Sequence, residues 1–254
     1  MRTDILKRLK FLAYVFFSLG LAVACYLRPS AEDFDRYVYE ALIRSARQPI
    51  GDIYRIVKHE SPRAEASTVL DSPAHLAQLK PLYAIRPLYL QLVSVAAIKL
   101  SPQEAINFVS AFSLFLIAIL SFVFTRSYLY SALLVATPAV IILGRLGGPD
   151  ALSSLVVATA CVAVLRDRSF AGILLLMVSV WIRTDNVLIL LAMLGWMLWK
   201  RMIAPQYAAV LAALAIGSVE YINVLSGNYG WLVLMHYSFV GGRYPAEITT
   251  GITL

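Results

Sequence analysis

The residues best suited to chemistry are charged side chains that stand beside long apolar segments. Asp33 and Asp35 form an acidic pair shortly after the first such segment, and Asp150, Arg183 and Asp185 lie at the ends of later ones. A positioned carboxylate can take a proton from an attacking hydroxyl, and a guanidinium can neutralise a leaving phosphate. Ionisable groups at membrane depth are costly and more often functional than decorative. These five residues are therefore the first candidates for a site.

Each of these candidates also has a structural explanation. Carboxylates favour helix N-termini, so Asp33 and Asp35 could belong to a solvated helix start. Asp150 follows two glycines and a proline, where a helix cap is expected. Arg183 and Asp185 are close enough in the sequence to pair with each other. The sequence leaves both kinds of role open.

Three further candidates stand in less specific surroundings. Arg86 precedes a proline and could contact a phosphate, or could extend its charge to the membrane interface. His236 and Arg243 lie in the C-terminal segment beside Tyr237 and Tyr244, where anchoring in the interfacial aromatic belt is the alternative. They are included as substrate-binding candidates together with Asp150, Arg183 and Asp185.

The sequence indicates no resident metal or cofactor. The three histidines, at 59, 75 and 236, do not have the spacing of metal ligands. There is no Walker loop and no dinucleotide-binding fingerprint. Acidic pairs can hold a divalent ion through their oxygens, so metal dependence stays open without being indicated.

The composition is that of a helical membrane protein. Of 254 residues, 60% are hydrophobic, and the long apolar stretches show no alternation. Only helices and closed barrels satisfy their backbone in lipid, and continuous apolar runs favour helices. The net charge of +7 comes from bases that flank apolar segments, so it predicts membrane orientation and no nucleic-acid partner. Cys25 and Cys161 lie inside apolar segments, and no disulfide is expected.

The apolar runs predict an all-α polytopic protein, one transmembrane domain over 1–254 with about seven spanning helices. The expected spans are 11–27, 105–125, 128–145, 150–165, 169–183, 186–199 and 205–225. The domain divides into a first helix (1–28), a long outer loop (29–103), six further helices (104–225) and an outer tail (226–254). The first helix is interpreted as retained, because its apolar run is longer than that of a typical signal peptide.

The distribution of bases predicts the orientation. With the N-terminus in the cytoplasm, most bases near helix ends fall inside, as the positive-inside rule requires: Arg126, Arg166, Arg168, Lys200 and Arg201. The segment 87–100 is short for a span, and it is placed as an interfacial helix in the outer loop. That loop also holds an amphipathic helix over 34–46 and a polar stretch over 59–75 that is expected to be irregular.

This arrangement resembles the GT-C superfamily of membrane glycosyltransferases, which includes the protein O-mannosyltransferases and the aminoarabinose transferase of lipid A. Its members share a seven-helix module with a catalytic acid early in the first outer loop, a place that Asp33-Phe34-Asp35 occupies here. The segment 148–152 matches a second acid at the start of the fourth span, and 183–185 resembles the basic turn after the fifth. Members usually continue with further helices or a soluble domain, which this sequence does not contain.

The resemblance implies transfer of a sugar from a polyprenyl-phosphate donor to an acceptor hydroxyl on the outer face of the membrane. In that reaction Asp33, or else Asp35, would be the base, Arg183 or Arg86 would contact the phosphate, and the lipid would lie in an apolar groove. The expected location is a bacterial inner membrane, with the active face periplasmic or extracellular. Two alternatives remain, a non-catalytic subunit with a partner subunit in a larger membrane complex and a transporter of a lipid-linked precursor.

Overall fold

The computed structural model describes residues 2–30, 35–45, 48–60 and 72–229, and every regular element in these ranges is an α-helix. The helices are α1 (Arg2–Leu27), α2 (Asp35–Arg44), α3 (Ile50–Glu60), α4 (Pro73–Ala84), α5 (Pro87–Ala96), α6 (Pro102–Thr125), α7 (Tyr128–Val135), α8 (Pro138–Arg145), α9 (Asp150–Leu165), α10 (Ser169–Ile182), α11 (Asn186–Trp199) and α12 (Pro205–Ser226). The predicted all-helical class is confirmed for this part of the chain.

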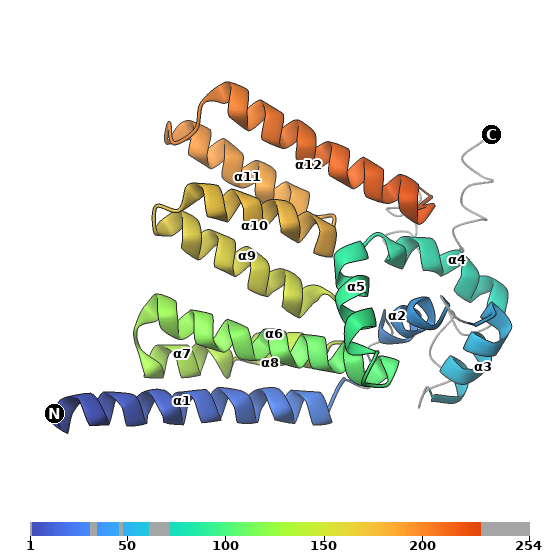
Figure 1. Cartoon of the computed structure of the whole chain (residues 1–254), viewed down its shortest axis with the longest axis horizontal. Coiled ribbons are helices and arrows are strands. Elements are labelled where there is room, and N and C mark those ends of the chain that lie inside the picture. The colour runs from blue at the N-terminus through green and yellow to red at the C-terminus, as the bar shows by residue number, and fades with distance from the viewer. Residues whose placement is uncertain (1, 31–34, 46–47, 61–71, 230–254) are drawn as a thin grey trace.

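The long helices stand side by side and the short N-terminal ones gather at one end of them. Helices α1, α6, α9, α10, α11 and α12 follow one another in a row, with α7 and α8 packed against α1 and α6 (Figure 1). The N-terminus and the turns after α6, α9 and α11 lie at one end of the row, and α2 to α5 lie at the other. The turns that precede α9 and α11 therefore lie at the same end as α2 to α5.

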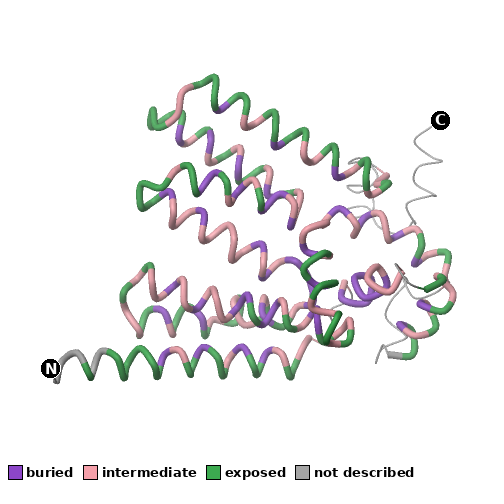
Figure 2. The backbone as a smooth tube through the Cα atoms, in the orientation of Figure 1, coloured by how far each residue is buried: buried purple, intermediate pink, exposed green. Residues whose placement is uncertain are grey.

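The surface of the row indicates membrane association. Three helices are long and apolar enough to cross a membrane, namely Arg8–Leu27 within α1, α6 and α12, and the bent pair α7 and α8 would make a fourth crossing. Figure 2 shows that the outer helices α1 and α12 are largely exposed. Large apolar side chains are among the exposed groups, such as Phe170 at 82% and Trp199 at 76%. A water-soluble protein rarely exposes so many large apolar side chains along its helices.

All seven predicted spans contain helix, but their lengths differ. The 16 residues of α9 and the 14 residues each of α10 and α11 correspond to about 24 and about 21 Å at 1.5 Å per residue. The hydrocarbon core of a bilayer is roughly 30 Å thick. The count of seven crossings therefore stays a prediction.

The span expected over 128–145 is not one continuous helix. The chain forms α7 and α8, which are bent by 60° relative to each other. Thr137 between them is extended (φ −65°, ψ 143°), and Pro138 is the first residue of α8. Proline disfavours helical backbone in the residue before it and cannot donate the hydrogen bond that would continue α7.

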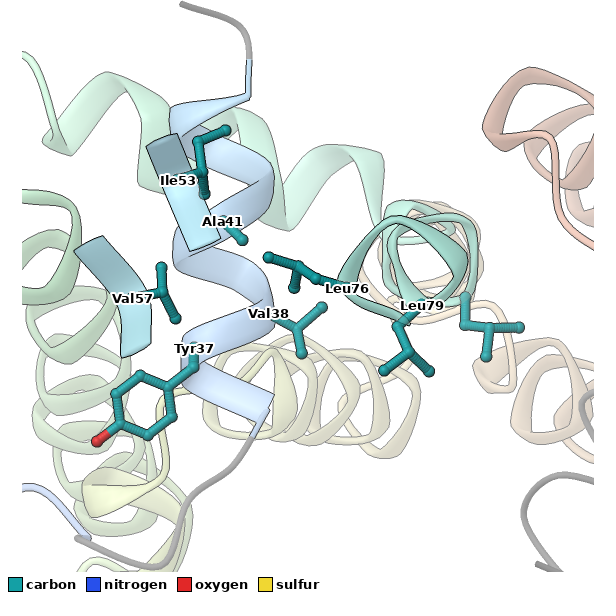
Figure 3. Close-up of a cluster of buried hydrophobic side chains, with 8 residues drawn as sticks. Tyr37, Val38, Ala41, Ile53, Val57, Leu76 and Leu79 are labelled. Carbon is teal, nitrogen blue, oxygen red and sulfur yellow. The ribbon is translucent and has the colours of Figure 1, made fainter. Parts of the chain in front are cut away.

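The helices between α1 and α6 form a packed layer. The amphipathic helix expected over 34–46 is present as α2, and it is buried on nearly all sides from Arg36 to Ala41, so its polar residues are covered as well as its apolar ones. On one side, Tyr37, Val38 and Ala41 pack against α3 and α4 (Figure 3). The stretch 59–75 was expected to be irregular, but α3 runs to Glu60 and α4 begins at Pro73, and 61–71 lies outside the described residues.

Candidate functional site

Helix α2 presents three chemically useful residues on one side. Asp35, Arg36 and Tyr39 occupy positions i, i+1 and i+4, which span an arc of about 100° around a helix. Asp35 is in the first turn and is half-buried. The Tyr83 hydroxyl, from the last turn of α4, donates a hydrogen bond of 2.7 Å to Oδ1 of Asp35. Helices α2 and α4 thus fix the position of this carboxylate together.

Tyr39 is the centre of an aromatic and cationic cluster. Its side chain is completely buried, and its ring makes edge contacts with Tyr83 and Tyr89 at centroid distances of 5.2 and 5.1 Å. Arg86 donates a hydrogen bond to the Tyr39 hydroxyl. The same guanidinium lies 5.5 Å from the Tyr39 ring and 5.4 Å from the Tyr83 ring, within the range of cation–π attraction.

Both tyrosines are held in their neutral form. Burial raises the pKa of Tyr39 well above its ordinary value; Arg86 opposes this shift, and Asp35 and Asp150 add to it. Burial also raises the pKa of Tyr83, and the adjacent Asp35 carboxylate raises it further. Neutral phenols remain hydrogen-bond donors. The positive charge of Arg86 is therefore not cancelled by a phenolate.

A second charged group is built from the ends of α9, α10 and α11. Arg183 follows α10 in extended backbone, and its Nε donates to both carboxylate oxygens of Asp185 at 2.9 Å. Its Nη1 pairs with Asp150, the first residue of α9. The buried Asn186 donates to Ser153 Oγ at 2.8 Å and to the Ser179 carbonyl at 3.0 Å. These bonds fix the three helix ends relative to one another.

The turn before α9 joins the two groups. The Tyr89 hydroxyl donates to the Gly147 carbonyl at 3.1 Å, and the Ser110 hydroxyl donates to the Gly148 carbonyl at 3.4 Å. A Cβ at Gly148 would lie 3.2 Å from a carboxylate oxygen of Asp150 and 3.9 Å from the ring of Tyr39. The charges of Asp150 and Arg183 both act on Tyr39. We call this assembly the Tyr39 site: Asp35, Tyr39, Tyr83, Arg86, Asp150, Arg183 and Asp185.

The Tyr39 site contains five of the eight candidates named from the sequence. Asp35, Arg86, Asp150, Arg183 and Asp185 come from four separate parts of the chain and meet at one end of the long helices. The other three, Asp33, His236 and Arg243, lie outside the described residues. Within the described ranges, no group of three or more histidine, cysteine, aspartate or glutamate side chains is placed to hold a metal ion.

The tyrosines were missed by sequence reasoning. Tyr39, Tyr83 and Tyr89 form the framework of the site, yet none was named as a candidate. One signal was available, because Tyr83 and Tyr89 stand three residues before and three residues after Arg86. Arg36 was missed as well, although it follows the acidic pair directly.

Comparison of the chain with protein-family models, curated proteins and solved structures found no match.

Proposed function

We propose that the protein is a membrane glycosyltransferase that moves a sugar from a polyprenyl-phosphate donor to an acceptor hydroxyl at the outer face of the membrane. The observation that carries the proposal is the convergence at Tyr39 of carboxylates and guanidiniums from four separate parts of the chain. Charged groups that collect around one buried side chain are typical of a reaction centre. The resemblance to the GT-C superfamily supplies the reaction class.

The reaction assigns a step to each kind of group. The acceptor oxygen attacks the anomeric carbon of the sugar, its proton passes to an aspartate, and the bond from the anomeric carbon to the phosphate oxygen breaks. The electron pair of that bond leaves with the polyprenyl phosphate. A positioned base contributes about 10²–10⁴-fold to such a step, and a cation stabilises the charge on the departing phosphate.

Asp35 is suited to be the base. It is half-buried, and its Oδ1 is oriented by Tyr83 at 2.7 Å. No other hydrogen bond to Asp35 is found within the described residues, which leaves Oδ2 for the acceptor. Asp33 is the second candidate for the same role.

Arg86 is better suited than Arg183 to contact the phosphate. Arg183 already pairs with two carboxylates, those of Asp150 and Asp185. Arg86 contacts neutral tyrosines, and among the described residues it pairs with no carboxylate. An incoming phosphate would therefore meet an uncompensated guanidinium at Arg86.

The membrane placement completes the proposal. Seven crossings, with the N-terminus in the cytoplasm of a bacterial cell, would put α2 to α5 and the Tyr39 site at the periplasmic or extracellular face. The base distribution supports this placement, because Arg126, Arg166 and Lys200 belong to the opposite ends of the helices. At the outer face a lipid-linked donor could enter from the bilayer and an acceptor from water.

The test replaces each candidate base singly. Asp35→Asn keeps the size of the side chain and removes its basicity, so it should lower transfer by about 10²–10⁴-fold if Asp35 is the base. Asp33→Asn is measured beside it, and Asp52→Asn, on the exposed surface of α3, is the matched control. Release of farnesyl phosphate from farnesyl-phosphate mannose, glucose and galactose is measured in liposomes. Full activity in both single variants would exclude either residue as an essential base.

A non-catalytic subunit of a membrane complex is the second candidate, and one observation favours it. Asp35 and Asp150 stand in the first turns of α2 and α9, and Asp185 immediately precedes α11. Carboxylates stabilise helix N-termini without any catalytic role. In such a protein Asp35→Asn should leave complex assembly unchanged and cost only about 0.3–1 kcal/mol of stability, because asparagine lacks the charge that favours the first turn.

A further inference from the structure

Arg36 is a buried cation with an unused donor. Only 7% of the surface of Arg36 is exposed, and its Nε has no hydrogen-bond partner within the described part of the chain. Its Nη2 donates to the Tyr37 hydroxyl at 3.2 Å, and its guanidinium lies 5.2 Å from the Tyr37 ring. Those contacts are with a neutral group. Burying a guanidinium without an anionic partner costs free energy. A bound anion that accepts a hydrogen bond from Nε would offset that cost.

The fold makes room for this side chain at a defined place. A Cβ at Gly147 would lie 2.7, 2.8 and 2.9 Å from the Cγ, Cβ and Cδ atoms of Arg36. Only glycine therefore allows the stem of Arg36 to cross the turn at this point. Gly147 stands three residues before Asp150, the first residue of α9, so the stem of Arg36 packs against the turn that leads into that helix.

The N-terminus of α9 is itself suited to an anion. The residue that precedes the helix is Pro149, which makes no side-chain capping hydrogen bond. Asp150 in the first turn already places one carboxylate at the positive end of the helix dipole, and the backbone N–H groups that no side chain caps are the donors that remain. Helix N-termini of this kind bind phosphate groups.

The nearby carboxylates are already engaged. Asp150 and Asp185 pair with Arg183, and Asp35 accepts a hydrogen bond from Tyr83. Glu40, one turn after Arg36 on α2, pairs with Arg44. Within the described residues, none of these four carboxylates forms an ion pair with Arg36. The positive charge of Arg36 is thus available to a ligand.

We propose that Arg36 and the N-terminus of α9 form an oxyanion-binding site that takes a phosphate group. The planar guanidinium, with Nε unused, matches the oxygens of a phosphate, and the helix end adds N–H donors. The phosphate can belong to a membrane lipid or to a soluble compound. The site does not depend on the proposed sugar transfer, because it follows from the Arg36 Nε that has no partner among the described residues and from the neighbouring helix end.

The experiment measures the melting temperature of the purified protein with and without phosphate ligands. Farnesyl phosphate, inorganic phosphate and farnesol are added separately to the wild type, Arg36→Met, Arg36→Gln and the control Arg55→Met, which removes an exposed arginine from α3. Replacing an uncompensated buried charge by methionine should leave the protein without ligand equally or more stable. The same change should abolish the ligand-induced rise and weaken farnesyl phosphate binding at least tenfold, and Arg55→Met should behave like the wild type.

The possible outcomes distinguish a soluble phosphate ligand from a lipid ligand, and they include results that would overturn the proposal. A rise with both phosphates supports the site and assigns a soluble ligand, and a rise with farnesyl phosphate alone supports a lipid ligand. An equal rise with farnesol would show that the isoprenoid chain is recognised instead, which would overturn the proposal. So would the absence of any rise in the wild type. If Arg36→Met does not fold, an unchanged ligand effect in folded Arg36→Gln would overturn it as well. None of these results requires sugar transfer, so the two proposals fail separately.

Discussion

Arg183 is the residue on which three helix ends depend. Its guanidinium pairs with Asp150 at the start of α9 and with Asp185 just before α11, and its own backbone ends α10. The side chains of Arg183 and Asp150 are 36% and 30% exposed, so water weakens the pairing without removing it. The arrangement assigns Arg183 a positioning role, whatever further contact it makes with a substrate.

Because Arg183 and Asp150 pair with each other, replacing both should cost less stability than the sum of the two single replacements. Arg183→Gln should destabilise the protein by on the order of 1 kcal/mol, because it leaves two carboxylates without their cation and solvent screens part of the effect. Arg183→Lys should lose less, since lysine keeps the charge but not the fork. Thermal unfolding of Arg183→Gln, Asp150→Asn and the double variant forms a mutant cycle. Strictly additive losses would show that the two side chains do not stabilise each other.

For single residues, the sequence predicted which side chains belong to the site better than it predicted which side chains they contact. Asp150, Arg183 and Asp185 could be named because each stands where an apolar run begins or ends. The pairing of Arg183 with Asp150, 33 residues away, depends on how the helices dock. The same holds for Tyr39, whose neighbours come from α4, α5 and the turn before α9. Local sequence carries no signal for such contacts.

Helices α9 and α10 pack closely against each other at a glycine. A Cβ on Gly172 would lie 2.9 Å from the backbone carbonyl oxygen of Ala160 and closer still to a methyl group of Val164. Backbone atoms cannot move aside as a flexible side chain can. Small residues that let helices approach closely are typical of contacts inside membranes. Gly195 on α11, by contrast, has nothing within 4 Å of its Cβ position.

Two alanine substitutions should therefore have opposite effects. Gly172→Ala should destabilise the protein by about 1–3 kcal/mol, because the new methyl group overpacks the contact between α9 and α10. Gly195→Ala should stabilise it by about 0.4–1 kcal/mol, since alanine restricts the unfolded chain and meets no obstacle in the helix. Unfolding by sodium dodecyl sulfate in mixed micelles measures both. Equal effects of the two changes would contradict the close contact.

The helices themselves could be predicted well and their packing could not. Apolar runs located α1, α6 and α9 to α12, because a membrane-type helix is a local pattern of composition. The break at Pro138 was overlooked, although a proline after Thr137 is a local signal. The burial of α2 could not be predicted, because α3 and α4 cover it only in the folded protein.

The whole molecule has two chemically different ends. The N-terminus and the turns after α6, α9 and α11 gather at one end, where Arg126, Arg166 and Lys200 stand. The other end carries α2 to α5 and the Tyr39 site. Both proposed activities need the second end to be accessible to ligands, so the orientation of the chain in the membrane decides which compartment supplies them.

Cysteine labelling of intact cells tests that orientation. In a background with Cys25 and Cys161 replaced by alanine, single cysteines are introduced at Ala74, on the exposed side of α4, and at Ser169, the first residue of α10. A membrane-impermeant maleimide should label the cysteine at position 74 from outside and the one at position 169 only after the cells are permeabilised. The physical reason is that the arginines at 166 and 168 belong on the cytoplasmic side. The opposite pattern would place the Tyr39 site in the cytoplasm, and it would remove a lipid-linked donor at the outer face from consideration.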